Sequence, residues 1–238
     1  MAYEPHFVPK PFAEGIWVAD GPRIPAGRLP VPVRMTAVRL GDGGLWLHSP
    51  IDARASLVEA VRALGPIRHL VAPNQAHLSW MPAWHEAAPE AKCWGAPGVA
   101  SRARRKRLDV PWEPPLGDEA PPDWAGEIDQ VIVEGSPVHR EAAFLHRPSR
   151  TLILTDLIEN LEPRALPFWL RPLARLAGAT HPDGRAPLHL RAAFTDRRAL
   201  RRSVERMIAW NPERIVVAHG LPFEGDGVAE LRRAFRWA

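Results

Sequence analysis

The sequence is poor in cysteine and has no long apolar run. Cys93 is the only cysteine in 238 residues, which excludes intrachain disulfides and zinc modules built from several cysteines. No apolar stretch reaches the roughly 18 residues that a transmembrane helix needs. The segment from Met1 to Lys10 also lacks the basic and apolar parts of a secretory signal. We therefore expect a cytoplasmic protein without a membrane span.

Signatures of several catalytic classes are absent as well. The sequence has no Gly-x-Ser-x-Gly turn for a serine nucleophile and no glycine-rich loop that cradles phosphates. Cys93 lies within the apolar run Lys92–Trp94, so we interpret it as a buried and unreactive thiol.

The positive charge is small and mostly dispersed. The formal net charge is +4, and 46% of the residues are apolar, as in ordinary globular proteins. One basic cluster lies between Arg102 and Arg107, but no aromatic residue interleaves with it and no nucleic-acid-binding motif surrounds it. We interpret this cluster as a solvated helix face or loop and expect no nucleic-acid partner.

Short apolar runs alternate with helical patterns along the chain, which indicates an α/β fold and one domain over residues 1–238. We predict strands at Gly15–Ala19, Val33–Leu40, Leu45–His48, Ile67–Ala72, Ala91–Gly95, Ile128–Glu134, Ala142–His146, Thr151–Thr155 and Ile215–Ala218. We predict helices at Ala53–Leu64, Met81–Ala88, Gly98–Leu108, Leu166–Leu176, Val228–Phe235, and from a cap at Thr195 or Asp196 to about Trp210. This order favours two facing sheets with helices outside over a doubly wound nucleotide-binding sheet, because no glycine-rich turn joins a strand to a helix.

The predicted helix at Leu166–Leu176 is strongly apolar and has flanking arginines. Packing as an ordinary core helix is the interpretation we favour. Resting on a membrane surface and covering a pocket are the alternatives.

Four segments place polar residues directly after apolar strands, where α/β folds assemble their sites. They are Val71–His77 (VAPNQAH), Glu134–His139 (EGSPVH), Leu152–Asp156 (LILTD) and Val216–Gly220 (VVAHG).

The order and spacing of these segments resemble the metallo-β-lactamase superfamily of hydrolases, most of all its branch DUF4336. That pattern is a strand ending in His-x-His-x-Asp-His, a later His, an Asp after an apolar strand, and a His-Gly near the C-terminus. The resemblance runs from about Gly15 to the end of the chain, and Thr155-Asp156-Leu157 and Ala218-His219-Gly220 carry it best. It implies a four-layer αββα sandwich and a metal-dependent hydrolase.

The first motif departs from the family pattern at three of its four ligand positions. Ala72 and Asn74 align with the two leading histidines and Ala76 with the aspartate, so that only His77 matches. In the family, this motif and the later ligands hold two metals that generate a hydroxide nucleophile. The resemblance implies that His77, Asp156 and His219 remain as the ligands of at most one divalent metal, for which zinc, iron and manganese are candidates.

Other polar residues are predicted to assist at this site. His139 aligns with the later histidine only after a small shift, and Glu141 can serve in its place. Asn74 can donate a hydrogen bond to a substrate or a bound water. We predict Asn74, His139 and Glu141 as catalytic residues that position the substrate or move protons. For Ser49, at the end of a predicted strand, we favour a turn hydroxyl over a side chain that faces the pocket. The remaining histidines are interpreted as structural or exposed: His69, His85, His146, His181 and His189.

Each predicted ligand also has a plain structural explanation when taken alone, such as a helix-start histidine or a carboxylate that caps a turn. Two functions therefore stay open. The chain is either a hydrolase-like enzyme with an eroded, mononuclear metal site, or a metal-free descendant that binds a small ligand or a protein in the former cleft. The sequence specifies neither the substrate nor the oligomeric state.

Overall fold

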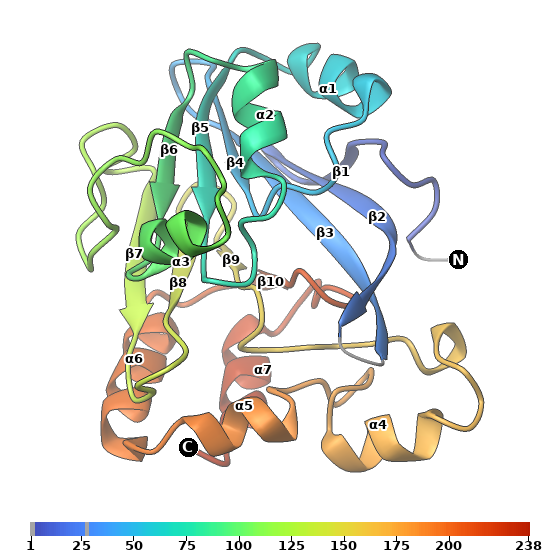
Figure 1. Ribbon diagram of the computed structural model, residues 1–238. Coiled ribbons are helices and arrows are strands. Elements are labelled where there is room, and N and C mark those ends of the chain that lie inside the picture. Colours follow the sequence, from blue (N-terminus) through green and yellow to red (C-terminus); the bar gives the residue numbers. More distant parts are fainter. Residues whose placement is uncertain (1–2, 27–28) are drawn as a thin grey trace.

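A computed structural model describes residues 3–26 and 29–238 and contains two β-sheets with helices on their outer faces (Figure 1). Among these residues the first sheet has the order β1 (Lys10–Ala13), β2 (Ile16–Ala26), β3 (Leu29–Arg39), β4 (Leu45–His48), β5 (Ile67–Ala72) and β6 (Lys92–Gly95). The second has the order β10 (Arg214–Val216), β9 (Thr151–Ile153), β8 (Glu141–His146) and β7 (Ile128–Val133). The helices are α1 (Ala55–Arg62), α2 (Met81–Ala87), α3 (Val99–Arg105), α4 (Arg171–Ala177), α5 (Leu188–Ala193), α6 (Arg197–Ala209) and α7 (Gly227–Ala234), with a short 3-10 helix at Pro163–Ala165.

Strand direction brings several carboxyl ends to one edge of the sandwich. Strands β4, β5 and β6 are parallel and joined through α1 and α2, and β9 is parallel to β10. The other neighbouring strands are antiparallel. The segments that follow β4, β5, β9 and β10 carry Ser49, Asn74, His77, Asp156 and His219, whereas His139 and Glu141 lie where β7 connects to β8.

Alternation of side chains along the second sheet gives it two buried faces. Phe144 of β8 points toward the first sheet, where its ring centroid lies 4.9 Å from that of Trp46 of β4. Its neighbours Ala143 and Leu145 point the other way, into a second cluster that includes residues of α6 and α7. Because α1, α2 and α3 add apolar residues to the first cluster, the layers are helix, sheet, sheet and helix.

Most predicted elements are present, with differences at their ends. β2 and β3 form a hairpin of two 11-residue strands, longer than the predicted strands, and β1 and α5 are not predicted from the sequence. Asp196 is the cap of α6, because its side chain accepts a hydrogen bond from the Ala199 amide at 3.0 Å. Cys93 is fully buried, and burial raises the pKa of its thiol to about 12. The basic side chains from Arg102 to Arg107 are exposed on and after α3, as expected.

The prediction of a packed core helix at Leu166–Leu176 is wrong. The helix α4 begins only at Arg171, and none of its seven residues is buried. The apolar side chains Phe168, Trp169, Leu173 and Leu176 are 78%, 60%, 60% and 77% exposed. Among the described residues, no helix combines the length and the apolar character needed to cross a bilayer.

Candidate metal centre

The predicted metal ligands His77, Asp156 and His219 come together at the edge where the carboxyl ends of β5, β9 and β10 meet. The Nε2 atoms of His77 and His219 lie 3.2 Å and 3.1 Å from Oδ1 of Asp156, and 3.2 Å from each other. Three donor atoms from distant parts of the sequence therefore form a nearly equilateral triangle. The side chains of His77 and Asp156 retain 11% and 18% exposure, so the triangle is open on one side.

These distances suit a single tetrahedral metal ion. With metal–ligand bonds of about 2.0–2.1 Å, the ligand atoms of a tetrahedral zinc site lie about 3.3 Å apart. The observed separations of 3.1–3.2 Å are close to this value. Two imidazoles and a carboxylate with an open fourth position are also the ordinary ligand set of a catalytic zinc. The residues present fit one divalent metal.

Hydrogen bonds to the protein orient both imidazoles. Nδ1–H of His219 donates to the carbonyl oxygen of Pro32 at 2.7 Å, which leaves Nε2 free to bind a metal. Nδ1 of His77 lies 2.7 Å from Oγ of Ser49 and would donate to it when Nε2 binds a metal. Such partners fix the tautomer and the ring orientation of metal-binding histidines. Ser49 therefore faces the site, contrary to the turn hydroxyl that we favoured from sequence.

Local backbone geometry explains why Asn74 stands shortly before His77 and why Gly220 follows His219. Oδ1 of Asn74 accepts hydrogen bonds from the amides of Ala76 and His77, at 2.8 Å and 3.2 Å, and so shapes the loop after β5. Gly220 has a φ of 113°, and a Cβ at this position would lie 2.1 Å from the carbonyl oxygen of Asn160. The residue after His219 must therefore be glycine.

A second polar cluster lies on the other side of Asp156. The buried Glu141 accepts hydrogen bonds from the amides of Thr155 and Asp156, at 2.7 Å and 2.9 Å. Nδ2 of Asn74 donates to Oδ2 of Asp156 at 2.8 Å and to Oε2 of Glu141 at 3.2 Å, and Nε2 of His139 lies 3.3 Å from that same Oε2. All three residues predicted to assist catalysis thus contact the Asp156 loop or one another.

Mutual contacts shift the pKa values of these groups. Burial opposes ionisation of Asp156, but His77 and His219 outweigh it and hold the pKa of this carboxyl well below its usual range. Burial would lower the pKa of His219, yet its hydrogen bond to Asp156 and the nearby negative charge raise it to about 9. For His139, the hydrogen bond and charge of Glu141 overcome burial and raise the pKa.

Two further charged residues, Glu159 and Arg34, interact with the His219 segment and are not predicted from the sequence. Desolvation raises the pKa of Glu159 to about 7, and its charge acts on His219. Arg34 of β3 is buried, donates to the carbonyl oxygens of Val217 and Gly220 at 2.9 Å and 2.6 Å, and pairs with Asp20 at 2.8 Å. The only sequence signal for Arg34 is a charge inside a predicted apolar strand.

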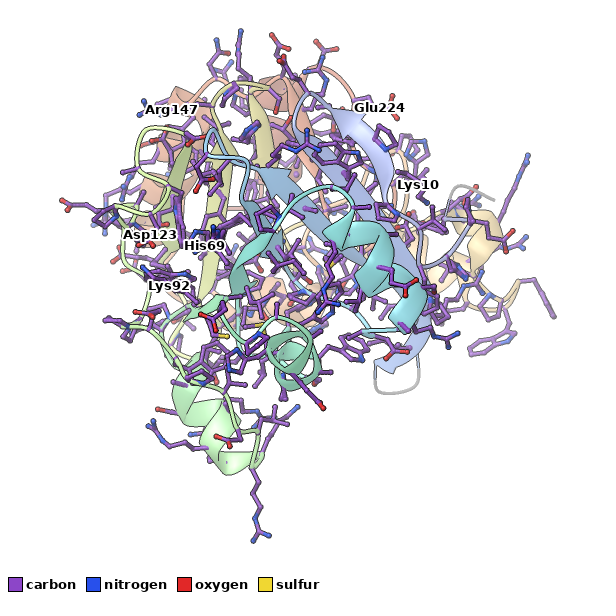
Figure 2. The ribbon with its side chains drawn as sticks, turned by 90° about the horizontal axis from the view of Figure 1, so that it is seen from above. Lys10, His69, Lys92, Asp123, Arg147 and Glu224 are labelled. Atoms are coloured by element: carbon purple, nitrogen blue, oxygen red, sulfur yellow. The ribbon has the colours of Figure 1, made fainter. Side chains whose placement is uncertain are left out.

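Histidines outside the centre have other roles. Figure 2 shows His69 beside Lys92 and Asp123, and Nε1 of Trp94 donates to its Nδ1 at 3.3 Å. Burial lowers the pKa of His69 to about 4. His146 is also buried and bonds to Ser149 at 2.8 Å, whereas His181 and His189 are exposed. These residues are structural or exposed, as the sequence indicated.

Comparison with solved structures identifies the fold. DIM-1 metallo-β-lactamase exposed to ceftazidime is 15% identical with a TM-score of 0.68, and the match covers 98% of this chain and 96% of that one. A metallo-β-lactamase from Erythrobacter litoralis is 16% identical with a TM-score of 0.66 and 96% coverage of both chains. Rubredoxin:oxygen oxidoreductase from Desulfovibrio gigas is 13% identical with a TM-score of 0.65, and the match covers 96% of this chain but 61% of that protein.

Comparison of the sequence with family models identifies the family of this chain. No curated protein matches the chain. The model of the domain of unknown function DUF4336 matches residues 15–180, which include β2 to β9 and all the predicted site residues except His219. The chain therefore has the metallo-β-lactamase fold and belongs to the DUF4336 family.

Proposed function

We propose that this protein is a hydrolase-like enzyme that uses one divalent metal held by His77, Asp156 and His219. The triangle of donor atoms 3.1–3.2 Å apart is the observation that carries this proposal. Both imidazoles already present Nε2 toward Asp156, so that metal binding needs no rearrangement of the loops.

The hydrogen bonds around Asp156 support one metal rather than two. Oδ1 faces the two histidines, whereas Oδ2 accepts from the side-chain amide of Asn74 at 2.8 Å. His139, Glu141 and Asp156 form a second group of possible metal ligands, whose ligand atoms all lie within 4.8 Å of one another. Oε2 of Glu141 already accepts from a backbone amide and from Asn74, so this carboxylate has little capacity left for a second ion. The Asn74 side-chain amide thus binds the oxygen of Asp156 that does not face the two histidines.

Each residue of the centre then has a distinct task. A bound metal supplies Lewis-acid polarisation of a substrate carbonyl or phosphoryl oxygen and lowers the pKa of a bound water. Asn74 and Glu141 hold the Asp156 loop in place. His139, 16% exposed and hydrogen-bonded to Glu141, is the group suited to move protons.

Metal analysis tests the proposal. The protein, purified without chelator and supplied in turn with zinc, iron and manganese, should bind one ion per chain. The double variant His77→Ala/His219→Ala should lose this ion, while His189→Ala, at an exposed histidine of α5, should keep it. A protein that takes up none of the three metals while its circular dichroism spectrum is unchanged would refute the proposal. A panel of phosphoesters, lactones and thioesters can then be assayed with the loaded protein.

The alternative function is a metal-free binding protein. It is favoured by the replacement of three family ligands by Ala72, Asn74 and Ala76, and by the ion pair between His219 and Asp156, which satisfies both groups without a metal. The same metal analysis separates the two functions, because only the enzyme requires a stoichiometric ion.

A further inference from the structure

The exposed apolar side chains of the molecule are concentrated in one segment. Seven large apolar side chains are exposed among the described residues, and five of them lie between Phe168 and Leu188. We call these five the apolar knob; they are Phe168, Trp169, Leu173, Leu176 and Leu188. Figure 1 shows α4 at the outer edge of the molecule, away from the helices that cover the first sheet.

The inner side of this segment is already packed. Leu170 and Ala174 join a small cluster with Leu161, Leu166 and Ala179. The knob residues Leu173 and Leu176, three positions apart in α4, lie on the same helix face and are left in solvent. No rearrangement within α4 can bury both faces, so the knob needs an external partner.

The knob is surrounded by positive charge that the protein does not compensate. From Leu161 to Arg191 the sequence has five arginines and two acidic residues, Glu162 and Asp183. None of these arginines forms an ion pair within the part of the chain that the structure describes. Arg164 and Arg175 are exposed beside the knob. The missing partner should therefore be apolar and anionic.

We propose that the apolar knob docks on an anionic lipid bilayer. Tryptophan, phenylalanine and leucine with flanking basic residues suit the boundary between head groups and acyl chains. Exposed arginines at that depth attract anionic head groups. A second copy of the chain fits less well, because a two-fold contact sets the same patch against itself and brings the uncompensated arginines of both copies together.

Docking would place the metal centre near the bilayer. The segment that carries the knob leaves the Asp156 loop, where the backbone amide of Asn160 donates to the carbonyl oxygen of His219 at 2.9 Å. The Leu161 amide then donates to the carbonyl oxygen of Ala179, just after α4, at 2.8 Å. The segment that carries the knob thus follows the Asp156 loop directly and is hydrogen-bonded to the His219 loop. The docking itself does not depend on a bound metal.

Vesicle flotation with the full chain tests this proposal. The protein should float with vesicles of phosphatidylcholine and phosphatidylglycerol and much less with phosphatidylcholine alone. Each arginine near an anionic surface contributes about fivefold to partitioning, so Arg164→Gln/Arg175→Gln should bind about 25-fold more weakly. Trp169→Gln/Leu173→Gln/Leu176→Gln should lose at least about tenfold, because it removes most of the apolar contact.

Matched controls lie elsewhere on the surface. Val138→Gln changes a side chain that is 71% exposed on the β7–β8 loop, and Arg104→Gln/Arg105→Gln removes two exposed arginines at the end of α3. Both should bind vesicles like the unchanged protein. Equal binding by the knob variants, or no binding to anionic vesicles at all, overturns the proposal. A concentration-dependent dimer that the knob variants abolish, without vesicle binding, assigns the knob to a second copy instead.

Discussion

Each imidazole of the metal centre has one nitrogen committed to the protein and one turned toward Asp156. His219 is held by a backbone carbonyl, which no substitution of a side chain removes, whereas His77 depends on the hydroxyl of Ser49. Ser49 also has a φ of 53°, a left-handed conformation that favours glycine, asparagine or aspartate. A non-glycine residue kept in this conformation beside a ligand indicates that the position serves the site.

Removing the Ser49 hydroxyl should weaken metal binding without unfolding the protein. In Ser49→Ala the ring of His77 loses its only hydrogen-bond partner at Nδ1, and loss of such a partner typically costs about 10–100-fold in metal affinity. Competition with a chromophoric chelator measures the change. Ser101→Ala, on α3, is the matched control and should bind metal normally. An unchanged affinity in Ser49→Ala would mean that His77 does not bind the metal through Nε2.

The raised pKa of His219 should make metal binding depend on pH. Because Asp156 overcomes the effect of burial and raises this pKa to about 9, the metal-free protein carries a proton at His219 that a metal must displace. Metal affinity should therefore rise by up to about tenfold per pH unit between about pH 6.5 and 9 and then level off.

Stability should follow the opposite trend in the metal-free protein. A histidine whose pKa is raised on folding stabilises the protein fully below its unfolded pKa of about 6.5, and this contribution disappears as the pH rises through about 9. The increase in Tm on adding zinc should thus be larger at the upper end of this range than at the lower end. An increase that does not vary with pH would contradict the assignment of His219 as a ligand.

The sequence predicted that His77, Asp156 and His219 lie together, as they do in the structure, but not which groups orient them. Each of these three residues follows an apolar strand, and this pattern can be recognised in the sequence alone. The partners Pro32 and Ser49 come from strands far away in sequence, and a backbone carbonyl such as that of Pro32 has no sequence signal. Only the register of the sheets brings these groups to the ligands.

At the scale of single elements, the apolar pattern predicted that α4 exists but not what covers it. Periodicity reports which faces of a helix are apolar, and it does not say whether the rest of the chain reaches them. In α4 only Ala174 packs, partly buried, toward Leu161 and Leu166, whereas Leu173 and Leu176 remain exposed. The core elements were easier to predict, because strands such as β5, with bounds Ile67–Ala72, are buried along nearly their whole length.

Because the apolar knob is exposed, polar substitutions there should leave the free energy of unfolding almost unchanged. Surface changes away from special features are usually within about 0.5 kcal/mol. We expect this for Trp169→Gln/Leu173→Gln/Leu176→Gln in urea denaturation. Leu170→Ala, in the packed cluster beneath, should cost about 2–5 kcal/mol if that cluster unfolds with the core. A large loss of stability in the triple variant would mean that the knob packs against the protein after all.

At the scale of the whole molecule, the centre depends on contacts between the two sheets. The three proposed ligands follow strands β5, β9 and β10, but β3 of the first sheet holds the His219 loop from the opposite side. The guanidinium group of Arg34 makes this link. Its Nη1 donates to the carbonyl oxygens of Val217 and Gly220, and its Nη2 pairs with the buried carboxylate of Asp20. The position of His219 is therefore set by the packing of both sheets.

Breaking this link should affect stability and metal binding together. In Arg34→Met the buried Asp20 keeps only Lys10 as a charged partner, and removing one member of a buried pair typically costs about 3–5 kcal/mol. Asp20→Asn/Arg34→Met leaves no buried charge unpaired, because the remaining partner Lys10 is 25% exposed, and it should regain much of this stability in urea denaturation. It still lacks the donor to Val217 and Gly220, so its metal affinity should remain reduced. Full recovery of both properties in the double variant would show that Arg34 only neutralises Asp20 and does not position His219.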